Sequence, residues 1–122
     1  MKKNKIVVLT ILTVFGSLIS FIIFKDKKLE NDGILLNART TEWIYGANIS
    51  MDLRYEFYYK GKKITGSNAT GNYRGNQNFV DKYFPVMYDP EYGSSELLVQ
   101  PANFKKYNIP FPDSLRWVLE YL

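Results

Sequence analysis

Two carboxylates share one side of a segment whose residues alternate between apolar and polar. Asp52 and Glu56 occupy positions of the same parity, so on a strand their Cα atoms would lie roughly 13 Å apart. Hydrolysis of a glycosidic bond by a carboxylate pair needs the two groups about 5–9.5 Å apart. Arg54 stands between them and offers each a partner for a surface ion pair. The pair therefore predicts a solvated charged face rather than an active site.

The chain lacks the side chains on which much protein catalysis and most zinc binding depend. Its 122 residues include no Cys and no His. Without thiolates or imidazoles there is no disulfide framework, no thiolate or imidazole ligand for zinc and no histidine base beside a serine nucleophile. We therefore expect a protein that is not an enzyme and that uses no cofactor or metal.

Aromatic residues are the other group that can do chemistry, because rings displayed on a sheet bind sugars, peptides or lipid head groups with a large contact area. Most of them are expected to fill a core. Three others are candidate contacts with a ligand or partner. Tyr58 lies on the polar side of the alternating segment, and Tyr73 and Tyr92 lie in loops. The expected core rings are Tyr55, Phe57, Tyr59, Phe79, Phe84 and Trp117.

Strands are the elements that must hold most of these side chains. Between positions 48 and 60 the odd positions are apolar or aromatic and the even ones are mostly polar. Such alternation is typical of a strand with one buried face. Gly61 supplies a turn, after which a second strand is expected from Lys63. Residues 33–45 predict an earlier antiparallel strand of the same sheet.

Residues 79–84 are predicted to form a short helix, which a short strand follows. Asn78 is of a type that caps helices, and Phe79 and Tyr83 have the i, i+4 spacing of neighbours on a helix face. Pro85 would end this helix, and residues 86–88 predict a strand.

The C-terminal part predicts one more strand and two short helices. The strand covers residues 96–99, and Pro101 suits the first turn of the helix that follows. Asp113 or Ser114 would cap a final helix that covers the sheet. The apolar side of this final helix would be formed by Leu115, Val118 and Leu119. The fold class is therefore α+β: a small antiparallel β meander or half-barrel with short C-terminal helices, preceded by a transmembrane helix.

That transmembrane helix is predicted for residues 6–24, which carry no charge. A helix of this length spans about 28 Å, close to the roughly 30 Å hydrocarbon core of a bilayer. The segment ends in bulky apolar residues followed by Lys25, with no small-residue cleavage site at that point. A cleaved signal peptide is the alternative, and an uncleaved anchor is the interpretation we favour.

Charge divides the chain in the same way. Residues 1–28 hold six of the sixteen basic residues and one of the twelve acidic ones, and the remainder is balanced. A nucleic-acid partner is therefore not expected. We interpret residues 1–5 as a basic flank, 25–33 as a charged linker and 34–122 as a β-rich extramembrane domain. The lysines flanking the helix are equal in number on its two sides, and the N-terminal amine favours an extracytoplasmic domain.

Within the predicted membrane helix, Gly16 and Ser20 have the small-x-x-x-small spacing that lets two helices approach closely. This spacing predicts a packing face for self-association in the bilayer.

Several structural motifs follow one another along the predicted domain: an aromatic strand at residues 55–57, a hairpin at Gly61, and a closing V-x-Y-D-P strand and turn at residues 86–90. In these motifs the chain resembles a family of small membrane-tethered β-domain proteins, over about half of the domain. That family has no assigned activity, so the resemblance implies a fold and a location but no function. Residues 71–78 and the proline-rich tail, residues 101–122, depart from its pattern.

Two functions of different classes agree with these patterns. The leading interpretation is a single-pass membrane protein of the cell envelope that displays a small, non-catalytic β-rich domain for binding or structural work, with the lipid bilayer and an envelope protein as its partners. The alternative is a membrane-tethered immunity or inhibitor protein that blocks a single protein partner. An acidic interaction patch would favour the alternative, and the near-neutral domain does not supply one.

Overall fold

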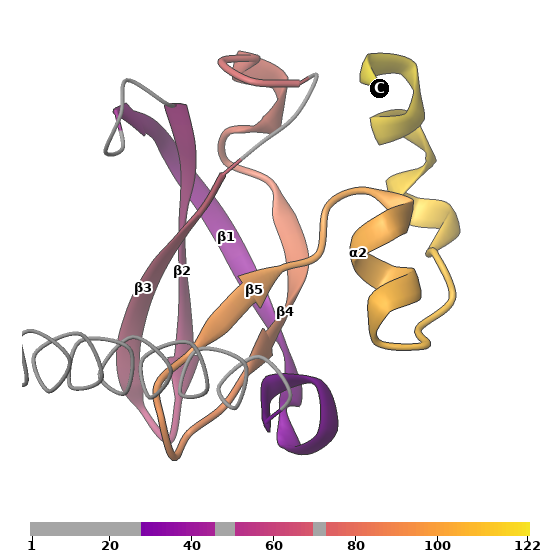
Figure 1. The fold of residues 1–122 in the computed structure, drawn as a ribbon. Helices are drawn as coiled ribbons and strands as arrows, with labels where there is room; N and C mark the ends of the chain where they lie inside the picture. Colours follow the sequence, from indigo (N-terminus) through magenta and orange to yellow (C-terminus); the bar gives the residue numbers. More distant parts are fainter. Residues whose placement is uncertain (1–27, 46–50, 70–72) are drawn as a thin grey trace, which may run out of the picture.

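Five strands form one antiparallel sheet in the order β3-β2-β1-β4-β5 (Figure 1). The computed structural model of the protein describes residues 28–45, 51–69 and 73–122. The strands are β1 (Ile34–Tyr45), β2 (Met51–Tyr59), β3 (Lys62–Ala69), β4 (Tyr83–Tyr88) and β5 (Ser95–Leu97). The sheet curves into a half-barrel, which confirms the predicted β architecture.

Short helical elements complete the domain. They are η2 (Gln77–Phe79), α2 (Pro101–Lys106) and η3 (Asp113–Tyr121), and residues 28–32 are also helical. Figure 1 shows α2 and η3 beside β4 and β5, at one side of the half-barrel. The described part of the predicted linker is thus helical, and its Leu29 is buried in the core.

The predicted membrane helix, with Gly16 and Ser20, lies outside the described residues. Among the residues that the structure describes, no helix has the length and apolar character needed to cross a bilayer.

The alternation in β2 places its odd residues inside the half-barrel, as predicted. Leu53, Tyr55 and Phe57 are all at most 1% exposed. The turn that follows has positive φ at both central residues, 51° at Lys60 and 76° at Gly61. This conformation matches the twist of the paired strands, which explains why a two-residue turn suffices here.

A side-chain amide joins the two edges of the sheet. Asn68 of β3 donates from Nδ2 to the carbonyl of Leu97 in β5 (2.8 Å) and accepts from the Leu97 amide (3.3 Å). Nearby, the Tyr55 hydroxyl is 2.7 Å from Oγ of Ser95. The Tyr55 ring crosses over Gly66, where a Cβ would lie 2.6 Å from the ring. A glycine is therefore required at this close approach between β2 and β3.

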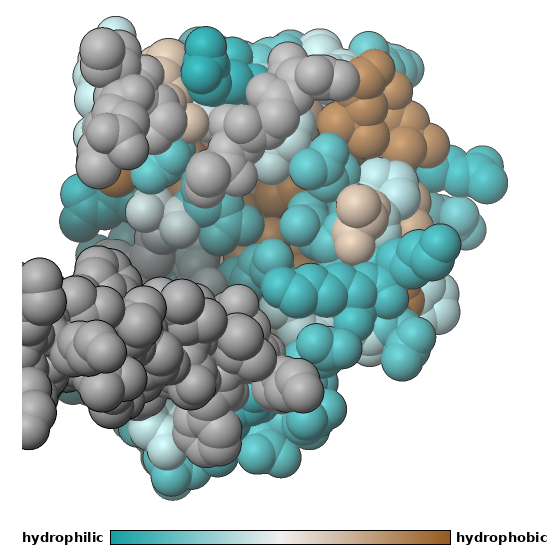
Figure 2. All heavy atoms as spheres, in the orientation of Figure 1, coloured by the Kyte–Doolittle hydropathy of each residue, from teal (hydrophilic) through white to brown (hydrophobic). Residues whose placement is uncertain are grey.

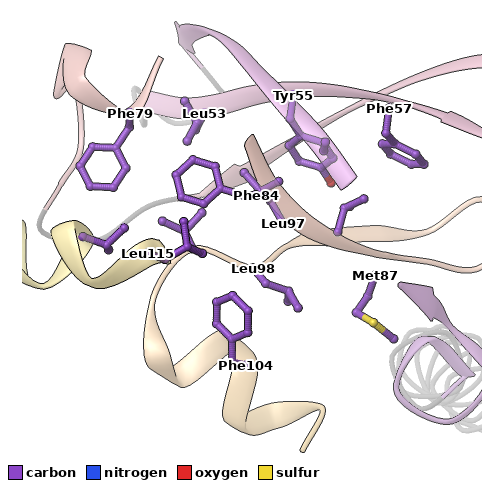
Figure 3. Packing of buried hydrophobic residues seen from close by; sticks show 14 of the residues in the cluster. Leu53, Tyr55, Phe57, Phe79, Phe84, Met87, Leu97, Leu98, Phe104 and Leu115 are labelled. Carbon is purple, nitrogen blue, oxygen red and sulfur yellow. The ribbon is translucent and has the colours of Figure 1, made fainter. Parts of the chain in front are cut away.

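The core fills the half-barrel and continues under the C-terminal helices (Figure 3). Phe79 is fully buried, and its ring centroid lies 4.5 Å from that of Tyr73 and 5.0 Å from that of Trp117. In Figure 3, Phe84 of β4 lies among side chains from the sheet and from the C-terminal segments, including Leu115 and Phe104. The expected core role of Phe57, Phe79 and Phe84 is confirmed.

The helix predicted for residues 79–84 is wrong. The chain forms only the short η2 helix, which Asn76 rather than Asn78 caps by accepting from the Asn78 amide (2.9 Å). Pro85 does not end a helix but lies within β4, opposite Asn37 of β1. The Pro85 carbonyl accepts from the Leu98 amide at 2.8 Å, just past the end of β5. The Pro85 nitrogen faces the same side as its carbonyl, so the missing N–H removes no hydrogen bond to β1.

The final helix exists, but its geometry differs from the prediction. Pro112 is its N-cap residue, and the helix is of the 3-10 type, with three residues per turn. This period buries Leu115 and Val118 and leaves Leu119 47% exposed. Figure 2 shows apolar surface over the C-terminal segment, where Leu119 and Leu122 are exposed.

Candidate functional site

The outward side of the sheet carries two exposed aromatic rings. Tyr58 of β2 is 63% exposed and Tyr83 of β4 is 62% exposed. Arg39 of β1 is the cross-strand neighbour of both Tyr83 and Glu56, so all three point to the same side. Tyr58, two residues beyond Glu56, shares this side, and the Cα atoms of the two tyrosines are about 12 Å apart by strand geometry.

A groove continues this outward side towards η3. It consists of two hollows, of about 370 Å³ and about 240 Å³, that share Lys82 and Trp117 in their walls. The first is lined also by Tyr83 and Ser114, and the second by Tyr121. Together the hollows reach the volume of a small-ligand site. We call them the Trp117 groove.

Packing inside the core fixes the ring of Trp117 in the groove. Its centroid lies 5.0 Å from that of Phe79 and 6.0 Å from that of Phe84. The neighbouring Tyr121 hydroxyl accepts a hydrogen bond from Nδ2 of Asn78 at 2.8 Å. One part of the indole is thus held by the core while another part lines the groove, as a rigid contact surface requires.

A buried threonine positions the polar wall of the groove. Oγ1 of Thr40 donates to the Phe79 carbonyl (2.5 Å) and accepts from the Lys82 amide (2.9 Å). The backbone of Thr40 makes two more bonds, to the Lys82 carbonyl (2.8 Å) and from the Asp81 amide (2.9 Å). Four hydrogen bonds therefore hold the segment that carries Lys82 and leads into Tyr83.

A network of ion pairs occupies the centre of the outward side. Arg39 lies 2.8 Å from Asp81 and 2.9 Å from Glu56, and Glu56 lies 3.0 Å from Lys63. Hydrogen bonds from Lys63 and then Arg39 lower the pKa of Glu56, and those to Asp81 and then Glu56 raise the pKa of Arg39. Arg54 pairs with Glu42 (3.3 Å), so its expected pairing with Glu56 is wrong.

Lys82 differs from these charges because it has no ion-pair partner among the described residues. Its ammonium group is therefore available to a polar or anionic group in the Trp117 groove. No cluster of three or more metal-ligating side chains occurs in the described part of the chain.

The structure separates the three tyrosines predicted as ligand contacts. Tyr58 is exposed as expected, whereas Tyr73 is only 3% exposed and stacks on Phe79. Burial raises the pKa of Tyr73 to about 12. The interpretation of Tyr73 as an accessible loop residue is wrong, because its ring completes the core beneath η2.

Tyr92 lies elsewhere, in the loop between β4 and β5, and is 38% exposed. Nζ of Lys28 is 5.4 Å from the centre of its ring. Tyr92 therefore belongs to the end of the domain where the chain comes in from its N-terminal segment, and not to the Trp117 groove.

Two residues of the candidate site were missed in the sequence. The i, i+4 spacing of Phe79 and Tyr83 predicts a helix, but Tyr83 and Pro85 alternate with Phe84 and Val86 as residues of a strand with one buried face do. Trp117 was expected only in the core. Its second role depends on the groove between η3 and β4, which no local pattern shows.

Comparison of the chain with protein-family models, with curated proteins and with solved structures finds no match. The resemblance to membrane-tethered β-domains therefore stays a prediction.

Proposed function

We propose that the protein is a single-pass membrane protein that displays a non-catalytic binding domain on the extracytoplasmic side, where its outward sheet face contacts an envelope protein. The observation that carries the proposal is the pairing of Tyr58 and Tyr83 on one rigid face beside the Trp117 groove. Tyrosine is enriched at the core of protein interfaces because its ring is large and its hydroxyl accepts water or a partner equally well.

Rigidity of the face supports this proposal. Tyr83 follows a segment held by four hydrogen bonds to Thr40, and Tyr58 lies in β2, which is paired on both sides. Side chains on such strands are already ordered before a partner arrives, so binding costs less conformational entropy.

Membrane attachment is supported by the uncharged stretch of residues 6–24. Carbonate washing of host membranes tests it directly: an anchored chain stays in the pellet, and a chain released into the supernatant contradicts the proposal. Protease added to intact cells then tests the side, because an extracytoplasmic domain is digested without lysis.

Site-specific photocross-linking tests the binding face. A photoreactive phenylalanine analogue replaces Tyr58 or Tyr83 in the full-length protein in its native membrane. Tyr45 is the matched control, since it is also an exposed tyrosine of the sheet (78%) but lies at the far end of β1. We expect one discrete protein adduct from positions 58 and 83 and none from position 45. Equal adducts from all three positions, or none from any, would contradict the proposed face.

A further inference from the structure

The chain joins the β domain at a fixed point. Nζ of Lys28 lies 2.6 Å from Oε2 of Glu91, in the β4–β5 loop, and 3.3 Å from Oδ2 of Asp32. The next residue, Leu29, is 6% exposed and belongs to the core. Residues 28–32 are therefore part of the folded domain and not a flexible linker.

Little chain separates this point from the predicted membrane helix. Only residues 25–27 lie between Phe24, the last uncharged residue, and Lys28. Even fully extended, four Cα–Cα steps span at most about 14 Å. The polar interfacial layer on each side of the hydrocarbon core is itself roughly 5–8 Å thick. The end of the domain at Lys28 is thus confined to the immediate surface of the bilayer.

The turn between β2 and β3 lies at the same end of the domain. Ile34, just after the helical residues 28–32, pairs with Tyr88. The ring of Tyr88 in turn contacts that of Tyr59, with centroids 5.4 Å apart. Figure 1 shows the β2–β3 turn, the β4–β5 loop and the indigo helical turn together at the lower end of the half-barrel.

The chemistry of this turn suits an anionic lipid surface. Lys60 and Lys62 are exposed, and neither forms an ion pair with any described residue, in contrast to Lys63, which pairs with Glu56. The ammonium of Lys60 lies over the ring of Tyr59 at 5.4 Å. Lysines beside tyrosine rings are a typical combination at the membrane interface, where the ammonium reaches lipid phosphates.

Acidic groups at this end are placed differently. Asp32 and Glu91 are both engaged by Lys28, and Glu30 is exposed on the same helical turn. The unpaired positive charge is therefore concentrated on the turn.

From this geometry we infer that the β2–β3 turn, through Lys60 and Lys62, docks on anionic lipid head groups of the membrane in which residues 6–24 anchor the chain. The inference rests on the proposed membrane attachment. It adds a second contact with the bilayer and so fixes the tilt of the domain. In this orientation β2 extends away from the membrane, and the outward face of the sheet is perpendicular to the membrane plane.

Because the sequence contains no cysteine, a single introduced thiol can be labelled specifically. Thr65 is an exposed residue of β3 close to the turn, and Tyr45 is an exposed residue at the far end of β1. Thr65→Cys and Tyr45→Cys in the full-length protein are labelled with a fluorophore and reconstituted into vesicles of phosphatidylglycerol and phosphatidylcholine. A lipid with a nitroxide on its head group serves as the quencher.

We expect strong quenching of the label at position 65 and weak quenching at position 45. Two lysines near an anionic surface favour the docked state by about thirtyfold. Lys60→Glu/Lys62→Glu removes this attraction and adds repulsion, so it should lower the docked-to-undocked ratio by more than that factor and remove most quenching at position 65. Arg74→Glu/Lys105→Glu makes the same change of charge at exposed residues away from the turn and should leave the quenching unchanged.

Equal quenching at positions 65 and 45, or quenching at 65 that Lys60→Glu/Lys62→Glu does not reduce, would overturn the inference. Thermal melting of each variant verifies that the fold is intact. Failure of the membrane attachment itself gives a different result, because carbonate then strips the protein from the vesicles and both labels become fully aqueous.

Discussion

Tyr55 and Tyr58 are three residues apart on β2, and their side chains lie on opposite faces of the sheet. Tyr55 points into the half-barrel, is fully buried and places its hydroxyl 2.7 Å from Ser95. Tyr58 points outward, is 63% exposed and lies beside the charged row of the sheet. The comparison teaches that in this aromatic domain the parity of a strand residue, and not its type, separates rings that stabilise the fold from rings available to a partner.

The largest effect is expected where a ring assigned to the surface proved to belong to the core. Tyr73→Ala removes a buried ring that stacks on Phe79 at 4.5 Å. Loss of a buried aromatic side chain costs about 3–5 kcal/mol of unfolding free energy. Urea denaturation followed by circular dichroism measures it. Tyr73→Phe, which keeps the ring, is the matched control, and a loss below about 1 kcal/mol for Tyr73→Ala would show that its ring is not part of the core.

The next effect concerns the space that an inward ring requires. Gly66→Ala places a Cβ 2.6 Å from the Tyr55 ring, so the ring or the β2–β3 pairing must shift. Overpacking of this kind costs about 1–3 kcal/mol. In a Tyr55→Leu background the same substitution should cost clearly less, since the conflict is with the ring. Equal costs in the two backgrounds would place the strain elsewhere.

Ionisation at high pH sharpens the contrast between inner and outer rings. Burial raises the pKa of both Tyr55 and Tyr73 to about 12 from 10. Because the raised value belongs to the folded state, their contribution is fully present below pH 10 and is lost as the pH rises towards 12. Each tyrosine should cost about 1 kcal/mol by pH 11. Urea unfolding at pH 9 and pH 11 measures the loss, and Tyr73→Phe should reduce it.

The smallest effect on stability is expected on the outward side. Tyr58→Ala and Tyr83→Ala remove exposed rings and should change the unfolding free energy by at most about 0.5 kcal/mol. The proposed function further predicts that, in the native membrane, the same two variants lose the partner adduct of a photoreactive group placed at the other position. A loss of stability comparable to that of Tyr73→Ala would mean that these rings support the fold instead.

Local pattern was enough to predict part of this architecture. The strict alternation of β2 predicts which residues are buried, and Gly61 marks the turn because the two-residue hairpin requires positive φ there. Pro101 begins α2 as expected. In each case the information lies within a few neighbouring residues.

The remaining features depend on contacts between distant segments. The local pattern of residues 79–84 predicts a helix. The structure differs because Thr40, some forty positions earlier, forms hydrogen bonds with the backbone of Phe79 and Lys82 and so fixes the start of β4. Leu119 is exposed because η3 adopts a three-residue period that its spacing does not reveal. Sequence reasoning found Tyr58, but the Trp117 groove requires knowledge of where η3 packs.

The amide of Asn68 has a consequence for how copies of this protein coexist at high concentration. The first and last strands of a sheet normally present backbone groups that can recruit a strand from another chain. Here one asparagine ties the two margins to each other through the backbone of Leu97. Intermolecular strand exchange and fibrillar assembly are thereby disfavoured, so crowding can bring many copies together while each keeps its own fold.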